Sequence, residues 1–327
     1  MLKVPYTSHD TLKTVRNSWE AMVRSPTFYA DRKKCGTSEH LLCLIQNDMN
    51  ERDMNPVFVV TIYDPVKGTW ERLPPIDDPQ TNGIQVWCQC VAVNRKLLLI
   101  GRIRPSDTSL MKSVDIYDFE SARWSRGADM PTPRLNFACC VSSSTGLVYV
   151  AGGEGEHDPR LASVEVYNVE TDKWEILPPM IEPHGFACRG FFMDGKLMVL
   201  EEFERGEVFD PSEGTWRMTA HVWNTRLETW RSREVCSFCG ELYLFTEQQV
   251  EKYDVEKDVW SVVASFPNPL DILFFKCSTQ WRDQIFFSAF GALGKHISYL
   301  FNPSTREFTE VTADGGKLII SAATVEI

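Results

Sequence analysis

Short apolar runs separated by polar turns follow one another along most of the chain. Typical examples are "KLLLIG" at 96–101, "LVYVAGG" at 147–153 and "ELYLFTE" at 241–247. Apolar runs of four to eight residues between turn signals are typical of β-strands. The hydrophobic pattern therefore predicts an all-β architecture over most of the chain.

The first 39 residues follow a different pattern. Apolar residues recur there at a helical interval: Leu12, Val15, Trp19, Met22 and Val23. This spacing predicts an amphipathic helix, with Ser8 as its N-cap. The following "SPTFYADRKKCG" predicts a shorter second helix that has Pro26 near its start and ends at Gly36.

Pairs of aromatic residues seven positions apart recur six times. The pairs are Tyr63–Trp70, Tyr117–Trp124, Tyr167–Trp174, Phe209–Trp216, Tyr253–Trp260 and Phe301–Phe308. An Asp or Asn follows each first aromatic residue, and the second aromatic residues lie 42 to 54 residues apart. Self-similarity at about 40–50 residues is the signature of propeller blades.

Each repeat contains four strand-like runs, which we call a, b, c and d from the inside outward. The first aromatic residue ends strand c, and the second begins strand d after a polar turn such as "VETDKW". Four antiparallel strands per repeat predict a six-bladed β-propeller. We interpret the aromatic pairs as packing between blades; the alternative is a surface on which sugars or bases stack.

The two ends of the repeat array predict how the ring closes. The first repeat has no strand a ahead of "HLLCLI" at 40–45, and "KLIISAATVEI" at 317–327 follows the last strand d. Residues from about 318 to 327 are therefore expected to supply the inner strand of blade one, which removes two sheet edges. The predicted organisation is a helical segment at 1–39 and a propeller at 40–327.

Composition narrows the functional classes. The formal net charge is −11, and nonspecific DNA or RNA binding needs a cationic surface. No apolar run approaches the roughly 18–20 residues of a membrane span, and the N-terminus has no apolar signal-peptide core. We therefore expect no nucleic acid or membrane partner and a cytoplasmic or nuclear location.

Cysteine and histidine do not form a convincing metal or catalytic motif. Seven of the ten cysteines fall on the predicted inner strands: Cys88, Cys90, Cys139, Cys140, Cys188, Cys236 and Cys277. Buried Cys behaves as a small hydrophobic residue, which suits a crowded central channel. The CxxC formed by Cys236 and Cys239 would place its thiols on opposite faces of a strand, and "GEGEHD" at 153–158 is interpreted as a solvated loop rather than an ion site. We expect neither metal nor cofactor.

The repeat resembles the kelch repeat. The resemblance rests on the Tyr-Asp…Trp spacing, on "AGG" at the end of strand b and on "LPPM" or "LPPI" after the Trp. It covers residues 40–327, although only blade three keeps the double glycine, at Gly152–Gly153. The resemblance implies a kelch propeller that binds proteins.

The front segment resembles the second half of an F-box, as found in plant F-box/kelch proteins. The matching residues include "VPY" at 4–6, Val15, Trp19, Ser25-Pro26, Phe28-Tyr29 and Arg32. This resemblance implies a non-catalytic substrate receptor of an SCF ubiquitin ligase, which delivers a target protein to the proteasome. The residues that it implies for contact with a Skp-type adaptor are Val4, Pro5, Leu12, Val15 and Trp19.

Two other interpretations remain open. Met1 stands where the first F-box helix would be ending, so the first part of the F-box is expected to be missing. A kelch interaction scaffold without ligase coupling is therefore the main alternative. A propeller enzyme similar to galactose oxidase would need a convergent set of Tyr, His and Cys ligands, and the sequence does not assemble one.

Loop lengths predict the face that binds the target. With this strand order, the b–c loops and the d–a connections share one face of the propeller, and the long irregular loops are all of these two kinds. Arg and Trp are enriched in binding hot spots. The candidate residues on this face are Arg102, Arg104, Arg134, Arg160, His184, Arg205, Trp223, Trp230, Arg231 and Arg233.

Overall fold

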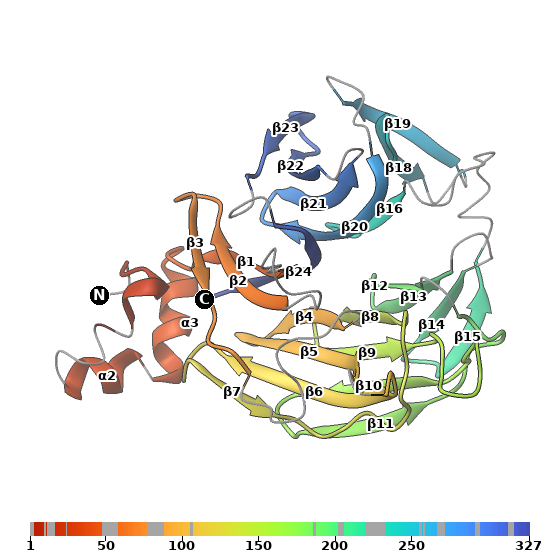
Figure 1. The fold of residues 1–327 in the computed structure, drawn as a ribbon, viewed down its shortest axis with the longest axis horizontal. Coiled ribbons are helices and arrows are strands. Elements are labelled where there is room, and N and C mark those ends of the chain that lie inside the picture. The colour runs from red at the N-terminus through yellow and green to blue at the C-terminus, as the bar shows by residue number, and fades with distance from the viewer. Residues whose placement is uncertain are drawn as a thin grey trace.

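The protein is a six-bladed β-propeller with a short helical segment at its edge (Figure 1). The computed structural model describes residues 3–9, 11, 17–23, 25–47, 58–76, 88–104, 107–185, 188–201, 206–219, 233–254, 257, 259–266, 272–291, 295–312 and 317–327. Within them, the strands form six antiparallel sheets of four strands each. The predicted fold class is confirmed.

Each blade contributes one strand to each of four positions. The inner strands a are β24 (Ile319–Glu326), β4 (Gln89–Val93), β8 (Ala138–Val141), β12 (Arg189–Met193), β16 (Glu234–Phe238) and β20 (Ile272–Trp281). The strands b are β1 (His40–Asn47), β5 (Lys96–Ile103), β9 (Leu147–Ala151), β13 (Lys196–Leu200), β17 (Glu241–Phe245) and β21 (Gln284–Gly291). The strands c are β2 (Phe58–Asp64), β6 (Leu110–Asp118), β10 (Val164–Asn168), β14 (Glu207–Asp210), β18 (Gln249–Asp254) and β22 (His296–Asn302). The outer strands d are β3 (Thr69–Arg72), β7 (Arg123–Arg126), β11 (Lys173–Leu177), β15 (Thr215–Met218), β19 (Val259–Ser265) and β23 (Glu307–Glu310).

The C-terminal strand closes the ring. β24 pairs with β1 in an antiparallel register that runs from His40↔Glu326 to Gln46↔Ile319. β24 also contacts the inner strands of blades two and six, so blade one is built from both ends of the chain. Ile319 and Val325 are buried at 1% and 2% exposure, which adds apolar burial to the main-chain pairing.

The recurrent aromatic residues face each other across strands c and d. Each of the six pairs is directly opposite in the register, as Tyr167 is to Trp174. Their ring centroids lie 4.4 to 5.2 Å apart. The Asp or Asn that follows the first aromatic residue shapes the turn, since its side-chain oxygen accepts backbone N–H groups two or three residues on, as Asn168 does from Glu170 and Thr171.

The indole N–H groups then join neighbouring blades. Trp124 donates to Pro74 O (2.7 Å), Trp174 to Ala128 O (2.9 Å) and Trp216 to Pro178 O (2.8 Å), each time across to the preceding blade. Buried apolar side chains of the described residues form clusters that lie between adjacent blades. The interpretation of the aromatic pairs as structural is confirmed, because the paired rings pack against each other and three of the Trp residues satisfy their polar tips between blades.

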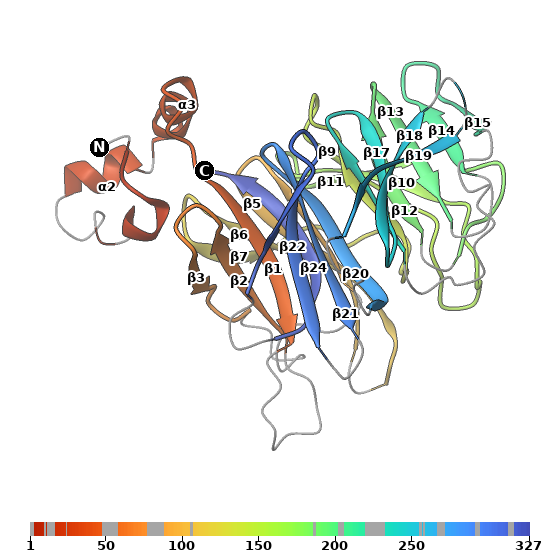
Figure 2. The same cartoon turned by 90° about the horizontal axis from the view of Figure 1, so that it is seen from above.

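The N-terminal helical segment lies beside blades one and two (Figure 2). It comprises η1 (Tyr6–Ser8), α2 (Asn17–Val23) and α3 (Pro26–Lys34). The second predicted helix is confirmed as α3: Ser25 caps it, and Gly36 follows at φ +62°. Ser8 ends the 3-10 helix η1, and His9 and Thr11 after it are helical. Residues 10 and 12–16 of the first predicted helix lie outside the described part of the chain, so its N-cap stays a prediction.

Deleting residues 319–327 is expected to remove the cooperative thermal transition of the propeller. The deletion exposes both the inner edge of β1 and the apolar residues that β24 covers, a loss comparable with the about 5–15 kcal/mol that stabilises a typical domain. Circular dichroism during heating measures the effect. Glu326→Gln is the matched control, because Glu326 pairs with Lys33 at the surface and the loss of this ion pair should shift Tm by little. A deletion variant that melts like the full chain would contradict the closure role of β24.

Candidate functional site

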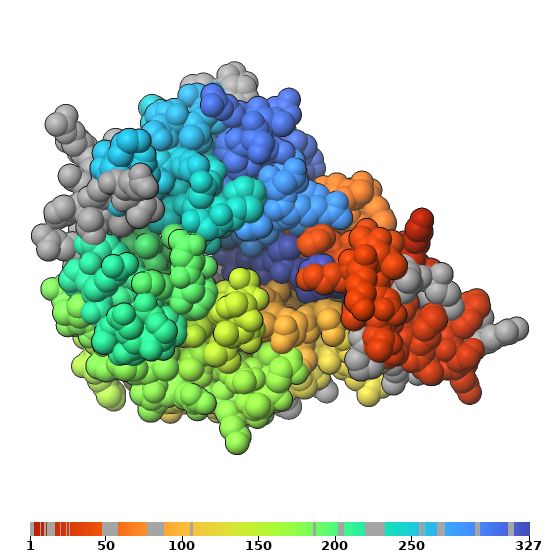
Figure 3. All heavy atoms as spheres, turned by 180° about the vertical axis from the view of Figure 1, so that it is seen from behind, coloured from red at the N-terminus to blue at the C-terminus, as the bar shows by residue number. Residues whose placement is uncertain are grey.

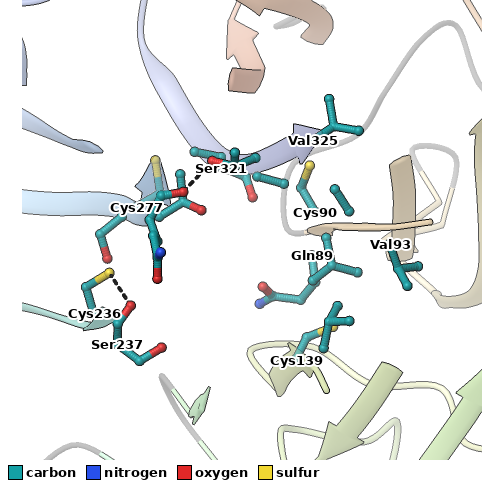
Figure 4. Close-up of a pocket in the computed structure, with 18 of the residues that line it drawn as sticks. Gln89, Cys90, Val93, Cys139, Cys236, Ser237, Cys277, Ser321 and Val325 are labelled. Carbon is teal, nitrogen blue, oxygen red and sulfur yellow. Dashed lines mark hydrogen bonds between the residues drawn. The ribbon is translucent and has the colours of Figure 1, made fainter. Parts of the chain in front are cut away.

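A cavity runs along the axis of the propeller. Its volume is about 1080 Å³, and inner strands from all six blades line it. Figure 3 shows the hollow at the centre of the ring. Figure 4 shows lining side chains, among them Gln89, Cys90, Cys139 and Cys277. A volume of this size is in the range of ligand-binding pockets.

The thiols that line the channel are unreactive at neutral pH. All ten cysteines are free, and seven of them lie on the inner strands or immediately before them. Burial raises the pKa of the Cys139 and Cys236 thiols to about 12. The thiol rather than the thiolate is therefore present at neutral pH, and the thiolate is the nucleophile and metal ligand.

The CxxC pair does not converge. Cys236 is buried in β16, whereas Cys239 is exposed in the turn that follows. Across the described part of the chain, no three His, Cys, Asp or Glu side chains come together in an arrangement that could hold a metal ion. Within the same residues, no helix is both long and apolar enough to cross a membrane.

Three of the predicted target-binding residues are interior ion-pair partners. Arg102, Arg134 and His184 have 0% exposure. Their carboxylate partners all stand two positions before the strand-c aromatic residue of a blade: Asp115 for Arg102 (2.8 Å), Glu165 for Arg134 (2.8 Å) and Glu207 for His184 (3.1 Å). The prediction that these three residues form part of an exposed binding surface is corrected, because burial removes them from any direct contact with a protein partner.

The recurrence of an acid two positions before the aromatic residue is the signal that could have revealed this role. Arg134 and His184 each lie four residues after a buried methionine, Met130 or Met180, in the connection that enters the next blade. In these two pairs the cation comes from the d–a connection, and the acid comes from strand c of the blade that follows. Arg102 instead lies on strand b of the same blade as Asp115. Removing either partner would leave a buried charge without compensation, which would lower the free energy of unfolding.

His184 is held between two carboxylates. Its Nδ1 donates to Glu201 (3.0 Å) and its Nε2 donates to Glu207 (3.1 Å). Burial lowers the pKa of His184, but the hydrogen bonds that its ring donates to both carboxylates outweigh burial and raise the pKa to about 9. The backbone of His184 also pairs with Leu161, so this imidazolium fastens the b–c loop of blade three to blade four.

The other candidates on the predicted face divide into two groups. Arg160 is 40% exposed and bonds to Glu201 at 2.6 Å, and Arg104 is 39% exposed and pairs with Asp107 at 3.4 Å. Arg233 is partly exposed directly before β16. Arg205, Trp223, Trp230 and Arg231 lie outside the described residues.

The N-terminal segment is anchored to the propeller by buried contacts. Tyr6 is 8% exposed and packs edge-on against Phe119 of blade two at 5.4 Å. Glu39 accepts hydrogen bonds from the backbone N–H of Tyr6 (2.6 Å) and from Arg32 (3.1 Å). Lys67, in the c–d turn of blade one, pairs with the same carboxylate. One acid therefore links η1, α3 and blade one.

The adaptor-contact candidates are placed only in part. The carbonyl of Val4 accepts a hydrogen bond from Arg32, and Pro5 precedes η1. Trp19 is partly exposed on α2, away from the channel. Leu12 and Val15 lie outside the described residues.

Comparison with known proteins places the chain in a family. The model of the FKB95 kelch-repeats domain matches residues 65–283. The F-box/kelch-repeat protein At2g44130 of Arabidopsis thaliana is 28% identical over 291 residues, which cover 77% of this chain and 70% of that protein. SKIP20 of the same plant, also named an F-box/kelch-repeat protein, is 30% identical over 274 residues, which cover 68% of this chain and 64% of SKIP20.

The propeller and its family match define a kelch-repeat protein. More particularly, the chain belongs to the plant F-box/kelch-repeat proteins, as its similarity to several Arabidopsis members over most of its length shows. The resemblance inferred from the aromatic repeat is confirmed at this level.

Replacing His184 by Ala is expected to lower the free energy of unfolding by about 3–5 kcal/mol, since it leaves Glu201 and Glu207 buried without their shared cation. Urea denaturation measures the change. His157→Ala is the matched control, because His157 is exposed in the b–c loop of blade three. A cost under about 1 kcal/mol for the His184 variant would contradict the proposed burial of a charged pair.

The same network predicts the direction of pH dependence. The pKa of His184 is raised, so its contribution to stability is fully present below about pH 6.5 and is lost as the pH rises through about 9. The free energy of unfolding should therefore fall more steeply between pH 7 and pH 10 in the wild type than in His184→Gln. Parallel pH profiles for the two proteins would show that His184 is not protonated in the native state.

Proposed function

We propose that this protein is the substrate-recognition subunit of an SCF-type ubiquitin ligase, in which the propeller binds a target protein for ubiquitination. The helical segment at the edge would dock on a Skp-type adaptor. The protein itself carries out no chemistry and acts by bringing the two partners together. Its place of action is the cytoplasm or the nucleus.

One observation carries this proposal: the helical segment that resembles part of an F-box is built onto the propeller by buried contacts. Tyr6, Val23 and Phe28 share a single hydrophobic cluster with Leu97 and Phe119 of blade two. The relatives that match this chain are named F-box/kelch-repeat proteins, which joins the same two modules in one family. A ligase receptor needs this arrangement, since the distance from adaptor to target decides which part of the target is reached.

The target side of the proposal rests on the loops of a rigid scaffold. The b–c loops and d–a connections leave the same ends of the blades, and the neighbouring blades are tied together by Trp hydrogen bonds and interior ion pairs. Binding residues are concentrated on such loops, because a fixed framework positions them at little entropic cost.

A kelch interaction scaffold without ligase coupling is the second candidate. The observation that favours it is the use of Tyr6 and the Val4 carbonyl in contacts within the protein. Residues that hold the segment on the propeller are not free to contact an adaptor. Under this hypothesis the propeller binds its target, but no ubiquitin is transferred.

Capture of a recombinant Skp-type adaptor by the purified chain separates the two candidates. We expect the chain to retain the adaptor, and we expect Trp19→Ala to weaken capture by at least about tenfold, because a large aromatic residue at an interface carries much of the binding energy. Ile176→Ala is the matched control, since Ile176 is an exposed hydrophobic residue on blade three, at 75% exposure.

A second preparation carries an additional N-terminal helix that completes the F-box pattern. Adaptor capture by both preparations supports the ligase receptor. If only the extended preparation captures the adaptor, the 327-residue chain binds a target protein but no adaptor. Capture by neither preparation overturns the ligase role and leaves the scaffold.

A further inference from the structure

The rim of blade six presents a row of side chains that neither the repeat nor the ring closure requires. Phe274 of β20, Phe290 of β21 and His296 of β22 are successive partners across three strands. Phe274 and Phe290 stack at 5.1 Å, and Phe290 and His296 lie 5.3 Å apart. All three are only partly buried.

Two lysines accompany this row. The Nζ atom of Lys276 lies 4.1 Å from the centroid of the Phe274 ring, and Lys276 lines the central cavity. Lys295 is exposed directly before His296. We call Phe274, Lys276, Phe290, Lys295 and His296 the blade-six rim.

The two lysines of the blade-six rim have no carboxylate partner within the described part of the chain. No ion pair joins Lys276, Lys295 or His296 to an acid there, and Nδ1 of His296 is buried without a hydrogen bond. Elsewhere in this protein of net charge −11, partly buried cations are matched: Arg189 pairs with Glu234 (3.2 Å) and Arg160 pairs with Glu201. Lys276, which is partly buried, is therefore an exception to this pairing among the described residues.

Burial without an anion is unfavourable for these groups. Burial lowers the pKa of Lys276. Burial also lowers the pKa of His296, and the nearby Lys276 lowers it further. An incoming carboxylate would relieve both effects, because it restores the interaction that the cations lose on leaving water.

The blade-six rim lies on the face of the propeller that the loop lengths predict to bind the target. Phe274 is near the start of strand a, Phe290 is near the end of strand b, and His296 begins strand c. These strand ends all meet the b–c loops and d–a connections. Leu273, at 50% exposure, adds an apolar contact at the same end of β20.

We propose that the blade-six rim binds an acidic segment of the target protein, with a carboxylate of that segment between Lys276 and His296 and its apolar neighbours against Phe274 and Phe290. The inference rests on the proposed function, since it names the chemistry of the target at the same face. Stacked aromatic rings beside a lysine that lacks a carboxylate among the described residues provide both apolar contact area and an electrostatic preference.

Selection from a random peptide library displayed on phage tests this proposal on the full chain. We expect the peptides retained by the wild type to be enriched in Asp and Glu. Synthetic copies of these peptides should bind the double variant Lys276→Gln/His296→Gln at least about tenfold more weakly than the wild type, as measured by fluorescence anisotropy.

The matched control removes two lysines that already have partners. Lys252 pairs with Glu241 (2.5 Å) and Lys257 pairs with Asp254 (2.7 Å), both on blade five. Lys252→Gln/Lys257→Gln removes two positive charges, at least as many as the rim variant removes, but should leave peptide affinity unchanged. Thermal melts of both double variants verify that each remains folded.

A further variant examines whether the chain's own acids occupy the rim. Asp48, Glu51, Asp53 and Asp271 lie outside the described residues, and all four are replaced by their amides. Acidic peptides that bind this variant but not the wild type would overturn the proposal, because the rim would then be filled from within.

The remaining outcomes are decisive as well. Retained peptides without acidic enrichment, retained peptides that bind the rim variant equally well, or the absence of any retained peptide each overturn the rim proposal. Adaptor capture, measured on the same preparation, shows separately whether the proposed ligase role stands.

Discussion

The structure depends on the pairing of β24 with β1. A propeller blade cannot bury both of its faces alone, so each sheet needs a neighbour on either side. Blade one obtains its inner strand only from the C-terminal end of the chain, and this strand contacts blades two and six as well. The contacts between the other blades therefore belong to a ring that is closed by the pairing of β24 with β1.

Buried ion pairs add structural specificity to the closed ring. The apolar clusters between blades could tolerate small rotations, whereas Arg134 with Glu165 and His184 with Glu207 hold each d–a connection in one position on the blade that it enters. Because both partners of each pair are buried, a shifted blade would leave charges without compensation. Lys276 of the blade-six rim differs from this rule, since none of the described residues pairs with it, and that difference is the physical basis for the proposed external partner.

The helical segment packs into a hydrophobic cluster that it shares with the propeller. Glu39 connects η1, α3 and the turn after β2, and Phe119 of blade two receives the ring of Tyr6. A segment held by buried contacts keeps a constant direction relative to the loops. For a receptor that presents a target to an enzyme, such a fixed direction limits the sites on the target that can be modified.

The sequence alone was sufficient for the features that arise from local chemistry. Two aromatic residues seven positions apart, with an Asp or Asn after the first, specify a strand–turn–strand hairpin, because register and turn are set within a few residues. Six copies of that hairpin and an unmatched strand at residues 317–327 predicted the ring and its closure. The kelch resemblance followed from the same positions.

Only the tertiary structure decided which charged residues belong to the interior. Arg134 and Glu165 are 31 residues apart, and His184 and Glu207 are 23 apart, so their pairing depends on how each d–a connection folds onto the blade that it enters. Loop position alone made Arg102, Arg134 and His184 resemble surface residues. The blade-six rim was hidden for the same reason, because Phe274, Phe290 and His296 come from three strands and become neighbours only when the sheet has formed.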